Sequence, residues 1–373
     1  MADLFKNLFS EELISHTAQA LQEVNCTFEK AQFQKQIFDI HWEEKEFKER
    51  MHHIADVVRS NLSDDFKDVV QELYIMIAYF KSSGADKVKF SELAFVFIPD
   101  IIEKFGINDF NISVEAFEKI TPFTTCEFAV RPFIIKYQDK MLNKVQEWTK
   151  HENEHVRRLA SEGSRPRLPW GMALAPLKQN PKPIMSILEA LKNDSSEYVR
   201  KSVANNLNDI SKDNPETVIE IAKAWIGKTK ETDWIVKHAC RTLLKAGNSE
   251  VLQLFGFAPP HKIELNDLTL KNESIKTGDE LEFSFLLTNV SSKSEKVRLE
   301  YAIYYMKKNG SQSKKVYKIS EKDYAAKSVT KITRKQSFKK VSTRKFYAGE
   351  HILSVIINGK EIEERTFELI EVV

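Results

Sequence analysis

The spacing of apolar residues changes near residue 257 and divides the chain into two parts. Up to about residue 256, apolar residues recur every three or four positions, for example at Leu73, Ile77 and Phe80. This period is typical of amphipathic helices packed on a core. Glycines and prolines interrupt it at short intervals, so we predict a series of separate helices.

Beyond the Pro259-Pro260 step, apolar and polar residues alternate instead. The clearest runs, which have the period of half-buried strands, are 281–287, 297–304 and 352–357. Asn309-Gly310 and Asn358-Gly359 lie between such runs and favour tight hairpin turns. About seven short strands in ~110 residues are typical of an immunoglobulin-like sandwich, here without the paired cysteines of antibody domains. We therefore predict a helical domain at 1–257 and a β-sandwich at 261–373.

A weak repeat lies at the end of the helical part. Three segments share a valine followed by a cation, 43 and then 37 residues apart: Val156-Arg157, Val199-Arg200 and Val236-Lys237. The period and the signature resemble HEAT repeats, which stack helix pairs into a solenoid with a concave face. Each cation could simply satisfy a helix end or a neighbouring acid. A row of three nevertheless favours a surface that binds an anionic partner.

Charge is distributed unevenly along the chain. The net charge is +2, but residues 261–373 carry +6 and the preceding residues carry −4. Between residues 307 and 345, 14 Lys and Arg stand against 2 Asp and Glu. Such a stretch is usually a solvated face, but it also attracts polyanions.

Several classes of protein are disfavoured by what the sequence lacks. Cys26, Cys126 and Cys240 have neither disulfide-framework nor metal-site spacing, which fits a reducing cytoplasm. The pair His52-His53 has no carboxylate or cysteine at ligand spacing, so we predict no metal site. We find no signal peptide, no membrane span, no P-loop, no nucleophile elbow and no dinucleotide fingerprint. We therefore expect a cytoplasmic protein.

Two segments carry a family resemblance, Thr125-Cys126-Glu127-Phe128-Ala129-Val130-Arg131-Pro132-Phe133 and Ser161-Glu162-Gly163-Ser164-Arg165-Pro166-Arg167-Leu168-Pro169-Trp170. They resemble signatures of the AlkC branch of DNA alkylation repair glycosylases, and the order of parts is similar along nearly the whole chain. This resemblance implies excision of small cationic lesions, such as 3-methyladenine and 3-methylcytosine, from duplex DNA. It also implies no metal and no cofactor. By position it implies active-site roles for Glu127, Glu162, Trp170 and Asp209.

Those residue types suit the chemistry. A base alkylated at a ring nitrogen is cationic and leaves readily, so the remaining task is to stabilise an oxocarbenium-like sugar. A carboxylate can do this while it orients water, and an aromatic face adds attraction for a cation.

Each candidate also has a simpler interpretation. Glu127 lies in an apolar run, which favours a buried functional carboxylate over a surface one. Glu162 precedes Gly163 at a helix end, where it opposes the helix dipole, so either a compensating arginine or a functional role is expected. Asp209 could simply cap its repeat, and Trp170 could be a packing plug in a loop.

The predicted DNA contacts are cationic. Arg165 and Arg167 alternate with Pro166, so they point in fixed, different directions, and guanidinium forks suit phosphates. The basic stretch of the sandwich would grip the backbone from the opposite side. The full predicted set is Arg131, Arg157, Arg165, Arg167, Arg200, Lys237, Lys339, Lys340, Arg344 and Lys345. Such contacts carry affinity without sequence information, which suits a lesion scanner.

Two alternatives remain at the level of the sequence. One is a HEAT-type protein scaffold, and the other is a catalytically inactive relative that recognises DNA damage. Among the three interpretations, only that of an active glycosylase requires Glu127, Glu162 and Asp209 to converge near Trp170. We expect a monomer that binds double-stranded DNA and no membrane, located in the cytoplasm and associated with the nucleoid when bound.

Overall fold

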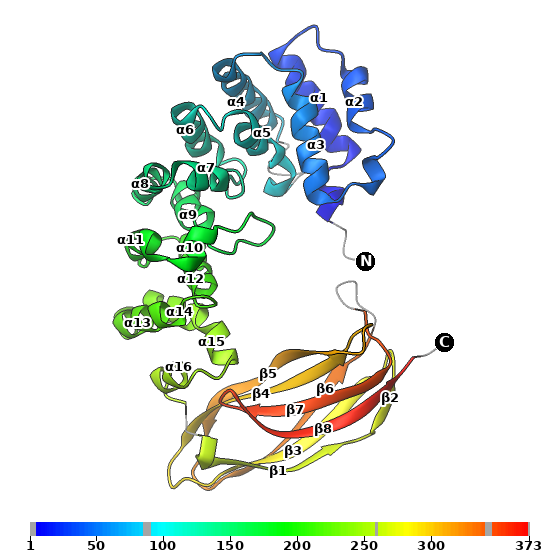
Figure 1. Ribbon diagram of the computed structural model, residues 1–373, viewed down its shortest axis with the longest axis vertical. Helices are drawn as coiled ribbons and strands as arrows, with labels where there is room; N and C mark the ends of the chain where they lie inside the picture. Colours follow the sequence, from blue (N-terminus) through cyan, green and yellow to red (C-terminus); the bar gives the residue numbers. More distant parts are fainter. Residues whose placement is uncertain (1–4, 85–90, 258–259, 340–344, 372–373) are drawn as a thin grey trace. The chain divides into compact units, whose positions relative to one another are not determined.

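The computed structural model describes residues 5–84, 91–257, 260–339 and 345–371, and it confirms helices followed by a β-sandwich (Figure 1). The helices are α1 (Glu11–Val24), α2 (Lys30–Ile37), α3 (Phe47–Arg59), α4 (Phe66–Ser82), α5 (Phe97–Phe105), α6 (Phe110–Ile120), α7 (Val130–Tyr137), α8 (Asp139–Trp148), α9 (Glu154–Gly163), α10 (Ala175–Gln179), α11 (Lys182–Leu191), α12 (Glu197–Ile210), α13 (Pro215–Trp225), α14 (Lys230–Ala239), α15 (Arg241–Lys245) and α16 (Ser249–Leu254). Short 3₁₀ helices are η1 (Phe5–Leu8), η2 (Trp42–Glu44), η4 (Glu92–Phe95) and η5 (Pro260–Lys262).

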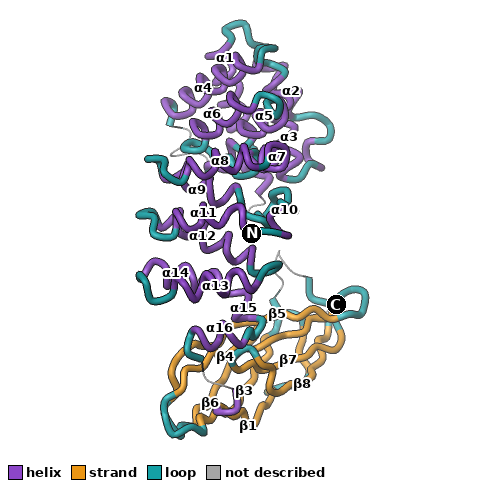
Figure 2. The backbone as a smooth tube through the Cα atoms, turned by 60° about the vertical axis from the view of Figure 1, so that its left-hand side comes forward, coloured by secondary structure: helices purple, strands orange, loops and turns teal. Residues whose placement is uncertain are grey.

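The helices pack as stacked pairs, as the repeat predicted. Successive pairs such as α8–α9 and α11–α12 lie in layers along the helical part (Figure 2). Each helix buries one apolar stripe, which in α12 includes Val199, Val203 and Leu207. Because α9 contacts both α8 and α12, the polar ends of α9 and α12 are held close together.

The strands form two sheets of a sandwich. They are β1 (Ile263–Leu270), β2 (Ser274–Lys276), β3 (Glu280–Asn289), β4 (Glu295–Met306), β5 (Gln312–Tyr324), β6 (Val329–Ser337), β7 (Gly349–Ile357) and β8 (Lys360–Ile370). One sheet has the order β1-β3-β6, and the other has the order β2-β8-β7-β4-β5, with β2 parallel to β8. Burial alternates along β3, as its period of two predicts, and places Phe283 and Phe285 in the core between the sheets.

The chain divides into two compact units. One holds residues 2–218 and 225–239, and the other holds residues 219–224 and 240–373. The change from helix to strand falls between Leu254 and Ile263, but α15 and α16 group with the sandwich. The functional division at 1–257 and 261–373 stays a prediction.

Two glycines fix the sandwich to the helices of its own unit. Asn358 and Gly359, with φ of 47° and 75°, form the predicted turn between β7 and β8. A Cβ atom on Gly359 would lie 2.1 Å from Cα of Gly247, which is in the loop between α15 and α16. The two backbones can therefore meet only because neither residue has a side chain.

This contact predicts that glycine-to-alanine substitutions in the two Asn-Gly turns lower the free energy of unfolding by different amounts. Gly310 also has a positive φ, in the other Asn-Gly turn, but a Cβ there would meet nothing within 4 Å. Gly359→Ala should therefore cost about 1–3 kcal/mol more unfolding free energy than Gly310→Ala, because crowding adds to the backbone strain. Urea denaturation of both variants measures the difference, and equal midpoints would show that the glycine contact contributes nothing.

Candidate active site

The four predicted catalytic residues lie on four elements of the helical unit. Glu127 is in the loop between α6 and α7, Glu162 is the penultimate residue of α9, and Asp209 is the penultimate residue of α12. Trp170 lies in the loop that leads from α9 to α10. The three carboxylates are buried, whereas Trp170 is 50% exposed.

A continuous chain of ion pairs joins the three carboxylates. In order the pairs are Glu127–Arg158 (2.7 Å), Arg158–Glu162 (3.6 Å), Glu162–Arg165 (2.6 Å), Arg165–Asp209 (2.8 Å) and Asp209–Lys212 (2.9 Å). Acids and bases alternate along it, so the formal charges of these six residues cancel. We call these six residues the ionic chain.

Hydroxyl groups complete the coordination of two carboxylates. The Thr125 hydroxyl donates to Oε2 of Glu127 at 2.8 Å, and the Ser202 hydroxyl donates to Oε2 of Glu162 at 2.6 Å. Arg158 also binds Oε2 of Glu127. Both contacts to Glu127 therefore use one oxygen, while Glu162 and Asp209 have partners on both of their oxygens.

The arginines of the ionic chain stay charged despite their burial. Burial by itself would lower the pKa of Arg158, but the carboxylates of Glu127 and Glu162 outweigh it and hold that pKa above its usual value. Burial would likewise lower the pKa of Arg165, but the carboxylates of Glu162 and Asp209 outweigh this effect and raise it. The carboxylates fixed beside Arg158 and Arg165 therefore keep both guanidinium groups protonated.

An aromatic residue borders the ionic chain at Arg158. The guanidinium of Arg158 lies over the ring of Tyr198, 4.6 Å from its centroid, and His155 contacts the same ring edge-on. Burial raises the pKa of Tyr198 to about 12. Tyr198 is 37% exposed, so it offers an uncharged aromatic side chain beside the carboxylates.

The Trp170 loop is held at its base by Arg131. This arginine is fully buried, and it donates to the carbonyls of Met172 at 2.5 Å and Gly163 at 3.0 Å. Burial lowers the pKa of Arg131 to about 10, and the charge of Arg165 adds to this effect. The observed contacts of Arg131 stabilise the loop, and its predicted contact with DNA stays a prediction.

The two arginines of the second signature segment differ in environment. Arg165 is inside the ionic chain with 8% of its side chain exposed, whereas the side chain of Arg167 is 38% exposed. Arg167 forms a two-point ion pair with Asp213 at 2.5 and 2.6 Å. Phosphate contacts by Arg165 and Arg167 stay predictions, and Arg167 is the more accessible of the two.

Two of the three repeated cations, Arg157 and Arg200, make the same hydrogen bonds to the backbone in their respective repeats. Each arginine donates to the carbonyls five and six residues before it, at 2.7 and 2.9 Å for Arg157 and at 2.9 and 2.5 Å for Arg200. Arg157 also pairs with Asp194 at 2.6 Å. These contacts close the turn that precedes α9 and α12, and Lys237 lies in the last turn of α14. DNA binding by this row stays a prediction.

The basic stretch of the sandwich is only partly described. Lys339 and Lys345 are exposed, and the ammonium of Lys345 lies 5.5 Å from the ring centroid of Tyr347. Lys340 and Arg344 lie outside the described residues. The role of all four in DNA binding stays a prediction.

Sequence reasoning missed several residues of the site. Arg158 lies four residues before Glu162, a spacing that places both on one helix face, and this could have identified it. Ser202, Tyr198 and Lys212 lie on α12 or just beyond it, at helical spacing from Asp209. The spacing of three residues between Asp209 and Lys212 could also have identified that pair, whereas no local signal connects Ser202 or Tyr198 with Glu162 and Glu127.

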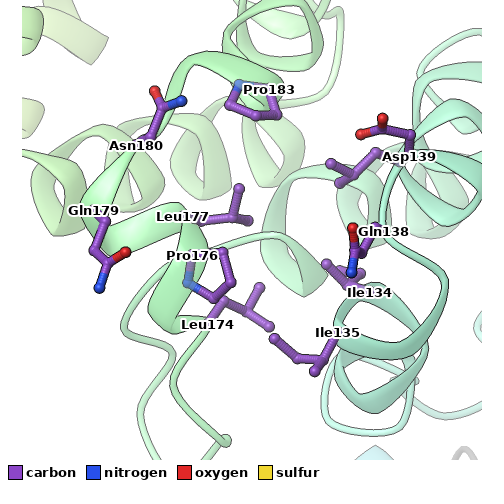
Figure 3. Close-up of a pocket in the computed structure, with 11 residues that line it drawn as sticks. Ile134, Ile135, Gln138, Asp139, Leu174, Pro176, Leu177, Gln179, Asn180 and Pro183 are labelled. Carbon is purple, nitrogen blue, oxygen red and sulfur yellow. The ribbon is translucent and has the colours of Figure 1, made fainter.

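A separate cavity lies between α7 and α10. It has a volume of about 360 Å³ and is lined mainly by apolar groups of α7 and α10, including Ile134, Leu174 and Leu177 (Figure 3). None of the four predicted catalytic residues is among its lining residues. Among the described residues, no group of three or more His, Cys, Asp or Glu is placed to hold a metal ion, and no helix is long and apolar enough to span a membrane.

Sequence profiles of known families match both parts of the chain. The family described as "DNA alkylation repair enzyme" matches residues 109–243, which include the whole ionic chain. The family described as "Uncharacterised protein YhaZ, C-terminal Ig-like domain" matches residues 264–371. With the helical repeats and the carboxylate cluster, these matches define the protein as a DNA alkylation repair enzyme.

Two similar proteins narrow this class. The uncharacterized protein YhaZ of Bacillus subtilis (strain 168) is 42% identical over 99% of this chain and 100% of its own length. The structure of the alkylpurine DNA glycosylase AlkC of Pseudomonas fluorescens, bound to DNA containing an abasic site analog, is similar with a TM-score of 0.91 and 34% identity. That match covers 98% of this chain and 99% of the other. This chain belongs to the AlkC family of DNA glycosylases.

The ion pairs predict that Arg165, which is buried in the ionic chain, is far more important for stability than Arg167, which is more exposed. Arg165→Met keeps the length of the side chain but leaves Glu162 and Asp209 buried with less compensation, which should cost about 3–5 kcal/mol of unfolding free energy. Arg167→Met breaks an exposed pair and should cost under about 1 kcal/mol. Urea denaturation tests both variants, and similar midpoints would contradict this account of the site.

Proposed function

We propose that this protein hydrolyses the N-glycosidic bond of cationic, N-alkylated bases of the 3-methyladenine and 3-methylcytosine type in duplex DNA. The observation that carries the proposal is the convergence of Glu127, Glu162 and Asp209 in one ionic chain of the helical unit. The AlkC relative is an alkylpurine DNA glycosylase bound to DNA, which supports alkylated purines as substrates and DNA as the partner.

The chemistry needs little acid catalysis. When the bond between C1′ and the base nitrogen breaks, its electron pair goes to the base, which leaves neutral because it began as a cation. Positive charge then develops on the sugar, water adds to C1′, and a proton is lost. A fixed carboxylate lowers the free energy of this charge more than it stabilises the neutral sugar of the ground state.

Glu127 is the carboxylate best placed for this role. Thr125 and Arg158 both bind its Oε2, so Oε1 can face a sugar or a water molecule. The oxygens of Glu162 and Asp209 are already engaged by Arg165, Ser202 and Lys212. We therefore assign to Glu162 and Asp209 the task of fixing the two arginines, and to Glu127 the direct stabilisation of the sugar cation.

The sharpest test removes one charge without changing shape. Glu127→Gln should lower the rate of base release by about 10²-fold, since a preorganised charge of this kind is typically worth that much, while DNA affinity changes little. Free methylated base released from methylated duplex DNA is measured over time. Glu115→Gln is the matched control, because Glu115 is exposed on α6 and pairs only with Lys119 among the described contacts.

Each outcome has a distinct meaning. If the wild-type protein releases no methylated base, it acts as a damage-binding protein or a scaffold and the enzymatic proposal fails. If the wild type is active and Glu127→Gln retains its full rate, the reaction is right and the role of Glu127 is wrong. Glu162→Gln and Asp209→Asn then show which carboxylate takes its place.

DNA binding through the basic stretch predicts a strong dependence on salt. Each phosphate contact contributes a slope of about −0.9 to the plot of log affinity against log salt. Replacing Lys339, Lys340, Arg344 and Lys345 with alanine should weaken binding and flatten that slope, without changing lesion preference. Titration of labelled duplex at several salt concentrations measures both quantities, and an unchanged slope would show that the stretch is solvated surface.

A further inference from the structure

The tip of the Trp170 loop is held by residues from the beginning of the chain. The Trp170 ring packs edge-on against Phe5, with centroids 4.8 Å apart, and at an angle against Phe47 at 5.5 Å. Phe47 is itself stacked on the buried ring of Phe9 at 5.2 Å. We call Phe5 and Phe47 the aromatic seat of Trp170. The indole remains half exposed on this seat.

The backbone of Trp170 is strained. Its φ is +61°, in the left-handed region that a bulky residue rarely adopts. Such a conformation is unfavourable in itself and persists where the surroundings determine it. The surroundings here are the seat behind the ring and one hydrogen bond at the carbonyl, which Lys48 of α3 donates from Nζ at 3.0 Å.

Lys48 also reaches the loop that carries Glu127. Its ammonium lies 5.5 Å from the ring centroid of Phe128, the residue next to Glu127. A single half-buried side chain of α3 therefore contacts the two loops that present Glu127 and Trp170. The contact spans 122 residues along the chain.

We infer that Lys48 is a positioning residue for the glycosylase reaction, and that it fixes Trp170 on the aromatic seat and relative to the Glu127 loop. This inference rests on the proposed function, because it assigns to Lys48 an effect on the same site. Small displacements of groups that contact a transition state are costly in rate. Loss of Lys48 should therefore act on catalysis more than on DNA binding.

Two other roles for Lys48 make different predictions. If Lys48 contacted a DNA phosphate, its removal would weaken DNA binding and flatten the salt dependence. Burial and the charge of Asp100 raise the pKa of Glu103 to about 7, against the opposing charges of His52, Lys48 and Lys104. If Lys48 served only to compensate Glu103, then Glu103→Gln would relieve the effect of losing Lys48. Positioning of Trp170 predicts neither result.

The experiment compares Lys48→Met with the wild type in base release from methylated duplex DNA. We expect kcat to fall about tenfold with little change in KM or in the salt slope, and Lys48→Arg to restore most of the rate because it can donate to the same carbonyl. Lys119→Met, which removes an exposed lysine of α6, is the matched control and should keep wild-type kcat.

Tryptophan fluorescence supplies a readout apart from activity. The contribution of Trp170 is the difference between each protein and its Trp170→Phe counterpart, and acrylamide should quench it more strongly in Lys48→Met and in Phe47→Leu than in the wild type. Unchanged kcat and quenching in Lys48→Met, with an active wild type, would overturn the inference. A rise in KM with a flatter salt slope would overturn it in favour of a phosphate contact, and rescue by Glu103→Gln would overturn it in favour of charge compensation. An inactive wild type would instead refute the proposed function.

Discussion

The burial of three carboxylates is the constraint on which the site depends. A buried carboxylate is costly unless a cation and hydrogen bonds compensate it, and Glu127, Glu162 and Asp209 come from a loop and two helices far apart in the sequence. Arg158 and Arg165 satisfy them in pairs, so each arginine fixes the distance between two elements. The ion pairs therefore add to the apolar packing of α9 on α12 a second requirement, that no acid of the ionic chain lose its base.

The repeat architecture explains why the acids meet. Glu162 and Asp209 are each the penultimate residue of a helix, in α9 and α12, and these helices pack against one another. The repeat thus brings two helix C-termini together, where the helix dipoles place negative potential. Carboxylates at such positions make that potential more negative. In the proposed function, the same pair of ends that makes the acids unfavourable for stability favours a positively charged nucleoside.

Much of this could be predicted from the sequence, but for two different reasons. The change in apolar period predicted the helices and the sandwich, because local spacing determines which faces can be buried, and the Asn-Gly pair predicted the turn at Asn358-Gly359. The carboxylates were predicted from their resemblance to a family, and for Glu162 also from its unfavourable position at a helix end. The expected compensating arginine exists twice, as Arg158 and Arg165.

What the sequence could not provide is the direction of side chains that have more than one possible partner. DNA binding by the row of Arg157 and Arg200 stays a prediction, but each also bonds the carbonyls of the turn before its own helix, a local contact that the spacing of valines does not reveal. A DNA contact by Arg131 also stays a prediction, and the bonds observed for it are to two carbonyls at the base of the Trp170 loop. An arginine is long enough to reach solvent or backbone from the same position, and the unfilled carbonyls at helix ends and in loops decide between them. The cations of a repeat can therefore be assigned to a ligand only after the backbone acceptors around them have been accounted for.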